Sequence, residues 1–224
     1  MQLEALIFDF DGTMLDTETP EFLSWQQIYS DHGAILEISD WGRGIGTWGA
    51  FDPWFDLETK IGRNLNKEPI AVAHHARVKA AIEASELLPG VLELLQSARD
   101  ARVKLAIASS SNREWVEGWA ARLGVLDFFA ATATQDDVQR VKPDPALYKL
   151  ACEKLGVQPQ SALALEDSAN GAKSALAAGL RCAVIPNPVT RTLEFPNGVV
   201  RLETLAGVTL EDLRVLMGAQ FSGK

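Results

Sequence analysis

The sequence of 224 residues has no uninterrupted apolar run long enough to span a membrane. The apolar residues ahead of Asp9 are too few for the core of a signal peptide. We therefore expect a cytoplasmic protein without a membrane partner. Cysteine is also scarce, and the two that are present, Cys152 and Cys182, lack the spacing of metal ligands. We predict two buried thiols, one in a helix and one in a strand, rather than a disulfide or a nucleophile.

Positive charge is in short supply as well. The 21 lysines and arginines are outnumbered by 30 acidic residues, which gives a net charge of -9. This balance excludes a general affinity for nucleic acid or acidic membrane surfaces, so an anionic substrate would have to be attracted locally. Repeats and low-complexity tracts are absent. With 47% hydrophobic and 23% charged residues, the chain reads as globular, with one good core and room for a second small domain.

Strands alternate with helices after Pro89, and one further strand stands near the beginning of the chain. This alternation predicts an α/β fold with a doubly wound, mainly parallel sheet, whose ligand sites lie beyond the carboxyl ends of its strands. The predicted strands cover residues 6–8, 103–108, 128–133, 162–165 and 182–185.

Residues 17–86 differ from the rest because they contain no convincing strand. Apolar residues recur there at helical spacing, first at Phe22, Trp25, Ile28 and Tyr29 and later at Ile70, Ala73, Ala76 and Ala80. A glycine-rich loop covers residues 41–49. We predict an inserted helical cap domain over residues 17–86, overhanging an α/β core domain of residues 1–16 and 87–224. The tryptophans of the cap are expected to pack within it, except Trp48 in the loop.

The first predicted strand ends in Asp9 and Asp11, whose side chains point the same way because they lie two residues apart. Gly12 then permits a sharp turn. Two carboxylates about 4 Å apart repel by about 4 kcal/mol at an effective dielectric constant of about 20, so a divalent hard cation between them is expected. A solvated turn with two ordinary acids is the alternative. An EF-hand calcium loop is excluded, because its glycine would stand at the sixth position.

Polar residues also follow the other predicted strands. Ser109 to Asn112 follow the second, Glu166 and Asp167 follow a later one, and a loop supplies Lys142. Each has an ordinary explanation: a helix cap for Ser109 to Asn112, first-turn acids for the pair, and a surface lysine. Their convergence at one edge of the sheet favours a shared site.

These residues carry a family resemblance. The sequence resembles the haloacid dehalogenase superfamily, in the branch that includes β-phosphoglucomutase-like sugar phosphatases. The first motif runs from Asp9 to Thr13, the second is Ser109, the third is Lys142 with Pro143, and the fourth is Glu166 with Asp167. All four stand in the family's order and at its usual separations, and the likeness spans the whole chain, including the helical cap.

The resemblance implies a magnesium-dependent phosphatase. Asp9 would be the nucleophile, forming a phosphoaspartate, and would also bind Mg²⁺. Asp11 would protonate the leaving alcohol and then accept a proton from water, and its backbone carbonyl would reach the metal. Asp167 would be a direct ligand, with Glu166 either a ligand or a partner through water. Lys142 would offset the charge beside Asp9.

The resemblance also suggests where substrate binds. Ser109 and Ser110, with nearby backbone amides and Lys142, would hold the phosphoryl oxygens. Glu18 and Trp48 of the cap and Asn112 of the core are the candidates for other substrate contacts. The expected substrate is a small phosphorylated metabolite, such as a sugar or polyol phosphate. We expect a monomer or a weak homodimer.

Alternatives to a phosphatase are distinguished by individual residues. Family members that displace halide lack an acid at the position of Asp11. The mutases carry a cap histidine and a basic pair that binds a second phosphate. An ungapped reading places Glu21 at the histidine position and Ile45 and Gly49 at the basic positions. Arg43 lies close enough in the sequence that a shifted alignment would restore part of this phosphate binding. A phosphosugar mutase is therefore the second reading. A phosphoacceptor signalling module would have a shorter chain without a cap. A non-catalytic binding protein on the same fold would have no need of Asp11.

Overall fold

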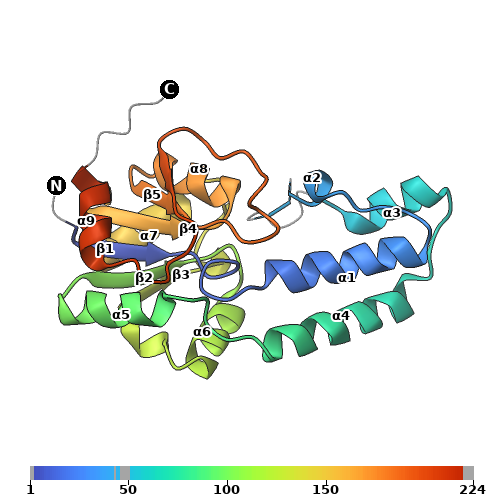
Figure 1. The fold of residues 1–224 in the computed structure, drawn as a ribbon, viewed down its shortest axis with the longest axis horizontal. Helices are drawn as coiled ribbons and strands as arrows, with labels where there is room; N and C mark the ends of the chain where they lie inside the picture. Colours follow the sequence, from blue (N-terminus) through green and yellow to red (C-terminus); the bar gives the residue numbers. More distant parts are fainter. Residues whose placement is uncertain (1–2, 43, 46–50, 219–224) are drawn as a thin grey trace.

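The computed structural model describes residues 3–42, 44–45 and 51–218. Six strands form a single sheet in the order β3-β2-β1-β4-β5-β6, and all neighbouring strands are parallel (Figure 1). The order reverses beside β1, which lies between β2 and β4, and this is where ligands bind in doubly wound sheets. The strands are β1 Ala5–Phe8, β2 Lys104–Ala108, β3 Ala131–Ala133, β4 Ala162–Glu166, β5 Arg181–Val184 and β6 Val199–Arg201.

The strand predictions are confirmed for β1, β2, β4 and β5. The predicted strand over 128–133 was too long, because a 3-10 turn, Leu126–Phe128, comes before it and pairing begins only at Ala131. The edge strand β6 was not predicted. It has three residues, none of them fully buried, so it lacks the apolar run that marks an interior strand. Cys152 and Cys182 lie buried and unbridged in α7 (Ala146–Leu155) and β5, as predicted.

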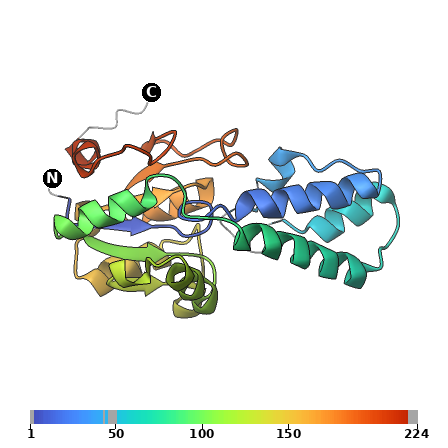
Figure 2. The same cartoon turned by 60° about the horizontal axis from the view of Figure 1, so that its bottom comes forward.

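Helices cover both faces of the sheet (Figure 2). Successive residues of β1 point to opposite faces, so Leu6 and Phe8 enter one apolar cluster and Ala5 and Ile7 enter the other. The first cluster is completed by α5 Val91–Asp100, α6 Arg113–Arg122 and α9 Leu210–Gly218. The second is completed by α7 and by α8 Ala169–Ala177. The predicted doubly wound α/β fold is thus confirmed.

The helices of the inserted segment lie beyond the carboxyl ends of the strands (Figures 1 and 2). They are α1 Glu18–Asp31, α2 Ile38–Trp41, α3 Pro53–Ile61 and α4 Lys67–Glu83. An apolar cluster joins α1 to α3, includes Trp25, Tyr29 and Leu57 and is flanked by Trp41 and Trp54, whereas the buried apolar residues of α4 belong to the cluster of the core. Packing within this segment is therefore confirmed for those three tryptophans, whereas Trp48 lies outside the described residues.

The predicted apolar face of α4 was wrong at its alanines. Ala73, Ala76 and Ala80 are exposed, and the buried positions are His74, Val78 and Ile82. His74 is tolerated there because its ring nitrogens have partners on α1: Ser24 Oγ at 2.8 Å from Nδ1, and Glu21 Oε2 at 3.1 Å from Nε2. His74 of this helix thus faces α1, whereas Val78 and Ile82 enter the apolar cluster of the core.

The chain crosses between the core and the helical segment at two points that pair with each other. Leu15 bridges both Asp11 and Leu87, and the backbone N–H of Leu88 donates to Met14 O at 2.9 Å. We call this pairing of residues 14–15 with 87–88 the hinge bridge. It places the start of α1 immediately beside the residues that follow β1.

A loop of the core also reaches the helical segment. Val189 belongs to the apolar cluster of α1 to α3, and Leu193 packs against the same cluster. On the neighbouring helix α8, the side-chain amide of Asn170 donates to Ile45 O at 3.1 Å. The helical segment therefore contacts the core both at the hinge bridge and through side chains at the strand ends.

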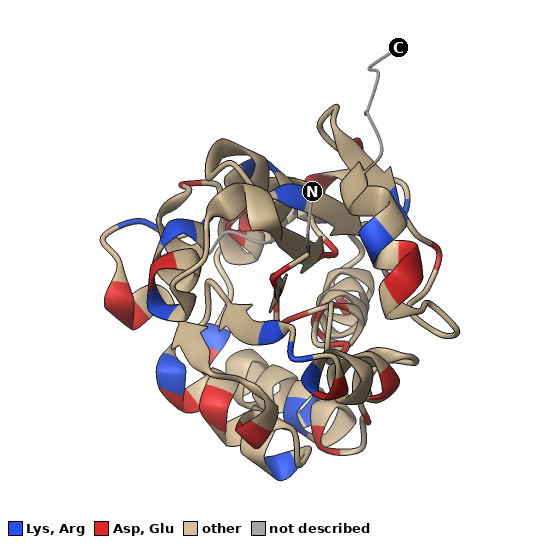
Figure 3. Cartoon of the chain, turned by 90° about the vertical axis from the view of Figure 1, so that its left-hand side faces the viewer, with Lys and Arg blue, Asp and Glu red and all other residues tan. Residues whose placement is uncertain are grey.

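Acidic and basic residues are interspersed over the core helices (Figure 3). The attraction of an anion therefore depends on individual groups rather than on a face of one sign. Within the described part of the chain, no helix is both long and apolar enough to cross a membrane.

Candidate active site

The parallel register brings the predicted polar residues to one edge of the sheet. Phe8, the last residue of β1, pairs with Ile107 of β2 and Leu165 of β4. Asp9 and Asp11 therefore follow β1 at the level where Ser109 follows β2 and where Glu166 ends β4. This edge faces the helical segment (Figure 1).

Lys142 links two of these strand ends. Its Nζ lies 2.5 Å from Asp9 Oδ1 and 2.6 Å from Glu166 Oε1. The lysine side chain is 1% exposed, so the interaction takes place out of contact with bulk water. A lysine is almost never buried to this extent unless it is paired, which explains why it lies between two carboxylates. The alternative of a surface lysine is excluded.

Glu166 is surrounded by donors. Its Oε1 accepts hydrogen bonds from Lys142 and from the Tyr148 hydroxyl at 2.7 Å, and its Oε2 accepts from Ser168 Oγ at 3.1 Å and Ser168 N at 3.3 Å. A carboxylate oxygen has about two acceptor sites, so both oxygens are well satisfied. A Cβ on Gly171 would collide with this carboxylate. The absence of a side chain at Gly171 therefore lets the Glu166 carboxylate pack directly against α8.

Asp167 is held from a different side. The side-chain amide of Asn187 donates to its Oδ2 at 2.6 Å. Gly12 approaches the same oxygen with a positive φ of +80°, and a Cβ there would overlap the Asp167 carboxylate. Glycine is therefore required at position 12 both for the turn and for this close approach.

The Asp11 carboxylate lies outside this cluster and has its own partners. Its Oδ1 accepts from Trp115 Nε1 at 2.9 Å and from Thr17 Oγ1 at 3.1 Å. Its Oδ2 accepts from Ser111 Oγ at 2.6 Å and, at a long 3.4 Å, from Ser109 Oγ. Asp9 and Asp11 thus begin as a pair on one strand end but are anchored by different elements.

The electrostatics of the cluster are dominated by burial. Burial and then the Glu166 carboxylate raise the pKa of Asp9 to about 8, while Lys142 acts in the opposite direction. Burial also raises the pKa of Asp167 well above its usual range, and Asp9 and Glu166 add to this. Burial by itself lowers the pKa of Lys142, but its two carboxylate partners raise it above the ordinary lysine value. One lysine cannot neutralise three buried carboxylates.

This donor set fits a hard divalent cation. Asp9, Glu166 and Asp167 each offer a carboxylate oxygen, and the three oxygens lie within 4.8 Å of one another. Mg²⁺ prefers oxygen ligands of this kind and is bound by one or two carboxylates together with water and phosphate oxygens. A cation here would offset the repulsion between the carboxylates, which adds to the effect of burial on the pKa values of Asp9 and Asp167.

The predicted substrate contacts lie around the cluster at different depths. Ser109 and Ser110 are buried, at 1% and 9% exposure. Glu18, in the first turn of α1, is partly buried, and burial together with the Asp11 and Glu21 carboxylates raises its pKa to about 8. Asn112 is exposed, and its Oδ1 accepts from Trp115 N as the N-cap of α6. Trp48 falls outside the described residues.

Four contacts at the site were missed by the sequence analysis: those of Thr17, Trp115, Tyr148 and Asn187. Trp115 and Tyr148 stand at helical spacing with apolar residues, which favours core positions, and both do pack against the core. Their polar atoms could have indicated these contacts, because a buried tyrosine hydroxyl or indole N–H needs a hydrogen-bond partner. Asn187 follows the end of β5, so the expectation that ligand sites lie beyond the carboxyl ends of the strands could have indicated it.

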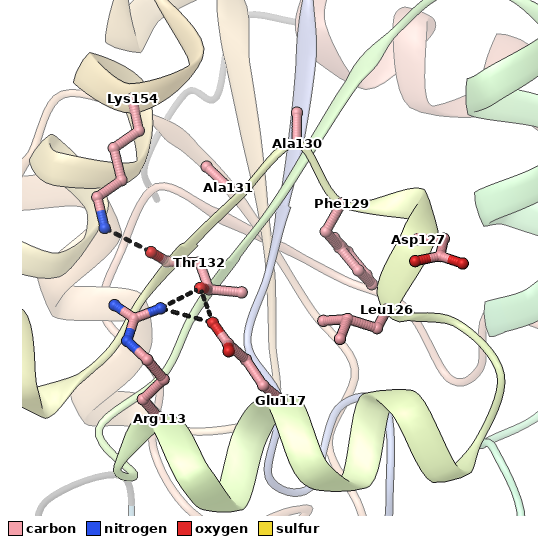
Figure 4. Close-up of a pocket in the computed structure, with 9 residues that line it drawn as sticks. All are labelled: Arg113, Glu117, Leu126, Asp127, Phe129, Ala130, Ala131, Thr132 and Lys154. Carbon is pink, nitrogen blue, oxygen red and sulfur yellow. Dashed lines mark hydrogen bonds and ion pairs between the residues drawn. The ribbon is translucent and has the colours of Figure 1, made fainter.

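A surface pocket of about 700 Å³ lies elsewhere, at the edge strand β3 (Figure 4). Arg113, which lines it, already contacts Glu117, Thr132 and Asp137, and Lys154 contacts Thr132 O. None of the carboxylates of the acidic cluster lines this pocket. Its two cations are already paired with protein groups, so we do not place the chemistry there.

Carboxylates that can hold a cation, a buried lysine and serine hydroxyls at one edge of a sheet suit the transfer of phosphoryl groups, which depends on positioning and on stabilisation of negative charge. The comparison with known families agrees. The chain belongs to the haloacid dehalogenase-like hydrolases, whose family model matches residues 3–179.

Individual relatives cover nearly the whole chain. The Bacillus subtilis protein named "Putative phosphatase YhcW" is 44% identical over 208 residues, which are 93% of this chain and 94% of that protein. Hexitol phosphatase B of Escherichia coli is 28% identical over 227 residues, covering 95% and 97%. A crystal structure of a CbbY variant from Rhodobacter sphaeroides, in complex with xylulose-(1,5)bisphosphate, superposes with a TM-score of 0.71 at 29% identity, covering 95% of this chain and 99% of that one.

Proposed function

We propose that this protein is a Mg²⁺-dependent phosphatase that hydrolyses small phosphorylated metabolites of the sugar or polyol phosphate class through a phosphoaspartate. The observation that carries the proposal is the buried cluster of Asp9, Glu166 and Asp167 around Lys142. Hexitol phosphatase B and the sugar bisphosphate complex of CbbY support the substrate class.

In the first half of the reaction, a carboxylate oxygen of Asp9 attacks phosphorus and the bond to the leaving alkoxide breaks. Asp11 donates its proton to the departing oxygen. Ser109, Ser110 and nearby backbone N–H groups hold the phosphoryl oxygens, and Lys142 keeps Asp9 in place and offsets negative charge. Mg²⁺, when bound, supplies electrostatic stabilisation of the phosphoryl oxygens.

In the second half, water attacks the phosphorus of the phosphoaspartate, Asp11 accepts the proton, and the bond between phosphorus and the Asp9 oxygen breaks. The products are inorganic phosphate and the original carboxylate. Asp9 and Asp167 would hold the metal directly, together with the backbone carbonyl of Asp11. Glu166 would join either directly, by giving up one of its present donors, or through water.

We further propose that residues 17–86 act as a cap domain over the core of residues 1–16 and 87–224. Glu18 and Trp48 of the cap and Asn112 of the core would contact the part of the substrate beyond the phosphate. The apolar cluster of α1 to α3 supports this division, because Val189 is, among the described residues, its one buried member from outside residues 22–57, and a segment with most of a core of its own can move as a unit.

A phosphosugar mutase remains the second candidate, and Glu21 bears on it. This residue, at the position of the mutase histidine, pairs with His74 of α4. Ile45, at one of the basic positions, is buried and apolar, whereas Arg43 and Gly49 fall outside the described residues. A single assay separates the two functions.

The test measures phosphate release from a panel of sugar, polyol and nucleoside phosphates, with Mg²⁺ and again with a chelator. We expect release only with Mg²⁺, and fastest from sugar or polyol phosphates. Isomerisation of a sugar phosphate on addition of a bisphosphate, without phosphate release, would establish the mutase instead. If neither reaction is seen with any substrate of the panel, both proposals are overturned.

A further inference from the structure

Among the four donors to Asp11, one differs chemically from the others. Ser109, Ser111 and Thr17 carry hydroxyls, which can turn and either donate or accept, whereas the Trp115 indole N–H can only donate. The indole therefore keeps Oδ1 as an acceptor. Oδ2, which faces the two serine hydroxyls, is the oxygen left for exchanging a proton with the substrate.

The indole ring is itself fixed in position. Trp115 lies in the first turn of α6, where Asn112 caps the helix by accepting from the backbone N–H of Trp115. Its ring centroid lies 5.7 Å from that of Trp119, one turn further along the same face. A side chain held by both its backbone and its ring can hold a carboxylate in turn.

The same face of α6 continues to the helical segment. The Arg122 guanidinium lies over the Trp119 ring at 5.0 Å and donates to the backbone oxygen of Glu83, the last residue of α4, at 3.3 Å. Thr17, the other partner of Oδ1, immediately precedes α1. Thr17 thus lies next to the first crossing between core and helical segment, and the helix that carries Trp115 contacts the end of α4, just before the second crossing.

We propose that Trp115 is a positioning residue for the general acid: its indole N–H orients the Asp11 carboxylate so that Oδ2 faces the leaving group. The proposal rests on the proposed phosphatase reaction. None of the four family motifs includes a residue of α6, so this role is additional to theirs. Because proton donation matters only for poor leaving groups, the role of Trp115 depends on the substrate.

The test compares kcat/KM for two substrates, because kcat/KM reports formation of the phosphoenzyme and not its hydrolysis. In Trp115→Phe, which keeps a ring and removes the N–H, we expect kcat/KM for a polyol phosphate to fall by about tenfold, through kcat rather than KM. For p-nitrophenyl phosphate, whose leaving group needs no proton, we expect a change of less than about twofold.

Trp119→Phe is the matched control, since it keeps an aromatic ring beside Trp115 while it removes an indole N–H that does not touch Asp11. We expect it to leave both substrates unchanged. An equal loss for both substrates in Trp115→Phe, or no loss for either, would overturn the proposal.

A second measurement does not depend on activity. In proton–nitrogen correlation spectra, the Trp115 indole N–H signal, identified by its absence in Trp115→Phe, is expected to shift in Asp11→Asn while the Trp119 signal stays in place. An unmoved Trp115 signal would contradict the hydrogen bond. A wild-type enzyme that hydrolyses neither substrate would instead refute the phosphatase function, leaving this spectroscopic result to judge the contact.

Discussion

The side-chain amide of Asn187 donates a hydrogen bond of 2.6 Å to Oδ2 of Asp167. The opposite end of the same amide is fixed too, because Asn187 Oδ1 accepts from the backbone N–H groups of Val189 and Thr190 at 2.9 and 3.0 Å. Asn187 is 7% exposed. A rigid loop therefore sets the orientation of a carboxylate that we assign to the metal.

Replacing this amide is expected to weaken metal binding. In Asn187→Ala, Asp167 loses its partner, and we expect the Mg²⁺ concentration for half-maximal phosphate release to rise by about tenfold or more. The measurement is a Mg²⁺ titration of activity. Asn66→Ala is a suitable control, since Asn66 is exposed in the helical segment and its side chain makes no capping bond. An unchanged titration would show that Asn187 does not position the ligand.

Removing the proposed nucleophile should stop the reaction without unfolding the protein. An amide cannot form the phosphoaspartate, so we expect Asp9→Asn to lose at least about a thousandfold in turnover. Mass spectrometry of acid-quenched enzyme should find phosphate on the peptide containing Asp9 in the wild type alone. Circular dichroism checks that the fold survives, and substantial turnover by the folded variant would refute the assignment.

Two helix glycines provide a matched pair for stability. In Gly171→Ala, the new methyl group would collide with the Glu166 carboxylate, and we expect a loss of about 1–3 kcal/mol in the free energy of unfolding. In Gly118→Ala, the methyl group enters open space on α6, so the better helix propensity should add about 0.5–1 kcal/mol. Urea unfolding of both variants measures the difference, and equal effects would contradict the close packing at Gly171.

The raised pKa of Glu18 predicts a pH-dependent stability. Glu18 titrates at about 8 in the folded protein, against 4.5 for the ordinary side chain. Between these values the folded state keeps a proton that the unfolded state has lost, so the contribution of Glu18 to stability falls as the pH rises from about 4.5 to about 8. Below this window the contribution is constant.

Glu18→Gln removes this titration. We expect the variant to gain in melting temperature relative to the wild type at pH 8, and to gain less at pH 5. The comparison is made with a chelator present, so that no cation contributes. A difference between variant and wild type that is the same at both pH values would show that partial burial and the neighbouring carboxylates do not raise the pKa of Glu18.

The parts of the site that could be predicted are those fixed by chain order. Asp9, Ser109 and Glu166 follow strands, and parallel pairing must bring such positions to the same edge. Lys142 was predicted from the family motif, and its burial between two acids follows from the charge that has to be offset.

The parts that escaped prediction depend on side-chain direction. Trp115 and Tyr148 look like core residues because most of their surface is apolar, and periodicity does not show where an indole N–H or a hydroxyl points. The buried face of α4 failed for a related reason: alanines match the helical period but bury little area, and His74 is buried because Ser24 and Glu21 lie opposite it.

The hinge bridge lies within a few residues of Asp11 and would be the pivot of the proposed cap. If the segment turns about this point, side chains near the pivot travel little, whereas the far ends of α1 and α4 sweep a wide arc. Glu18, which we propose to contact the substrate, is the first residue of α1 and lies beside the same pivot as Asp11. The proposed general acid and this recognition residue would thus keep their relative positions while the remainder of the cap opens and closes over the substrate.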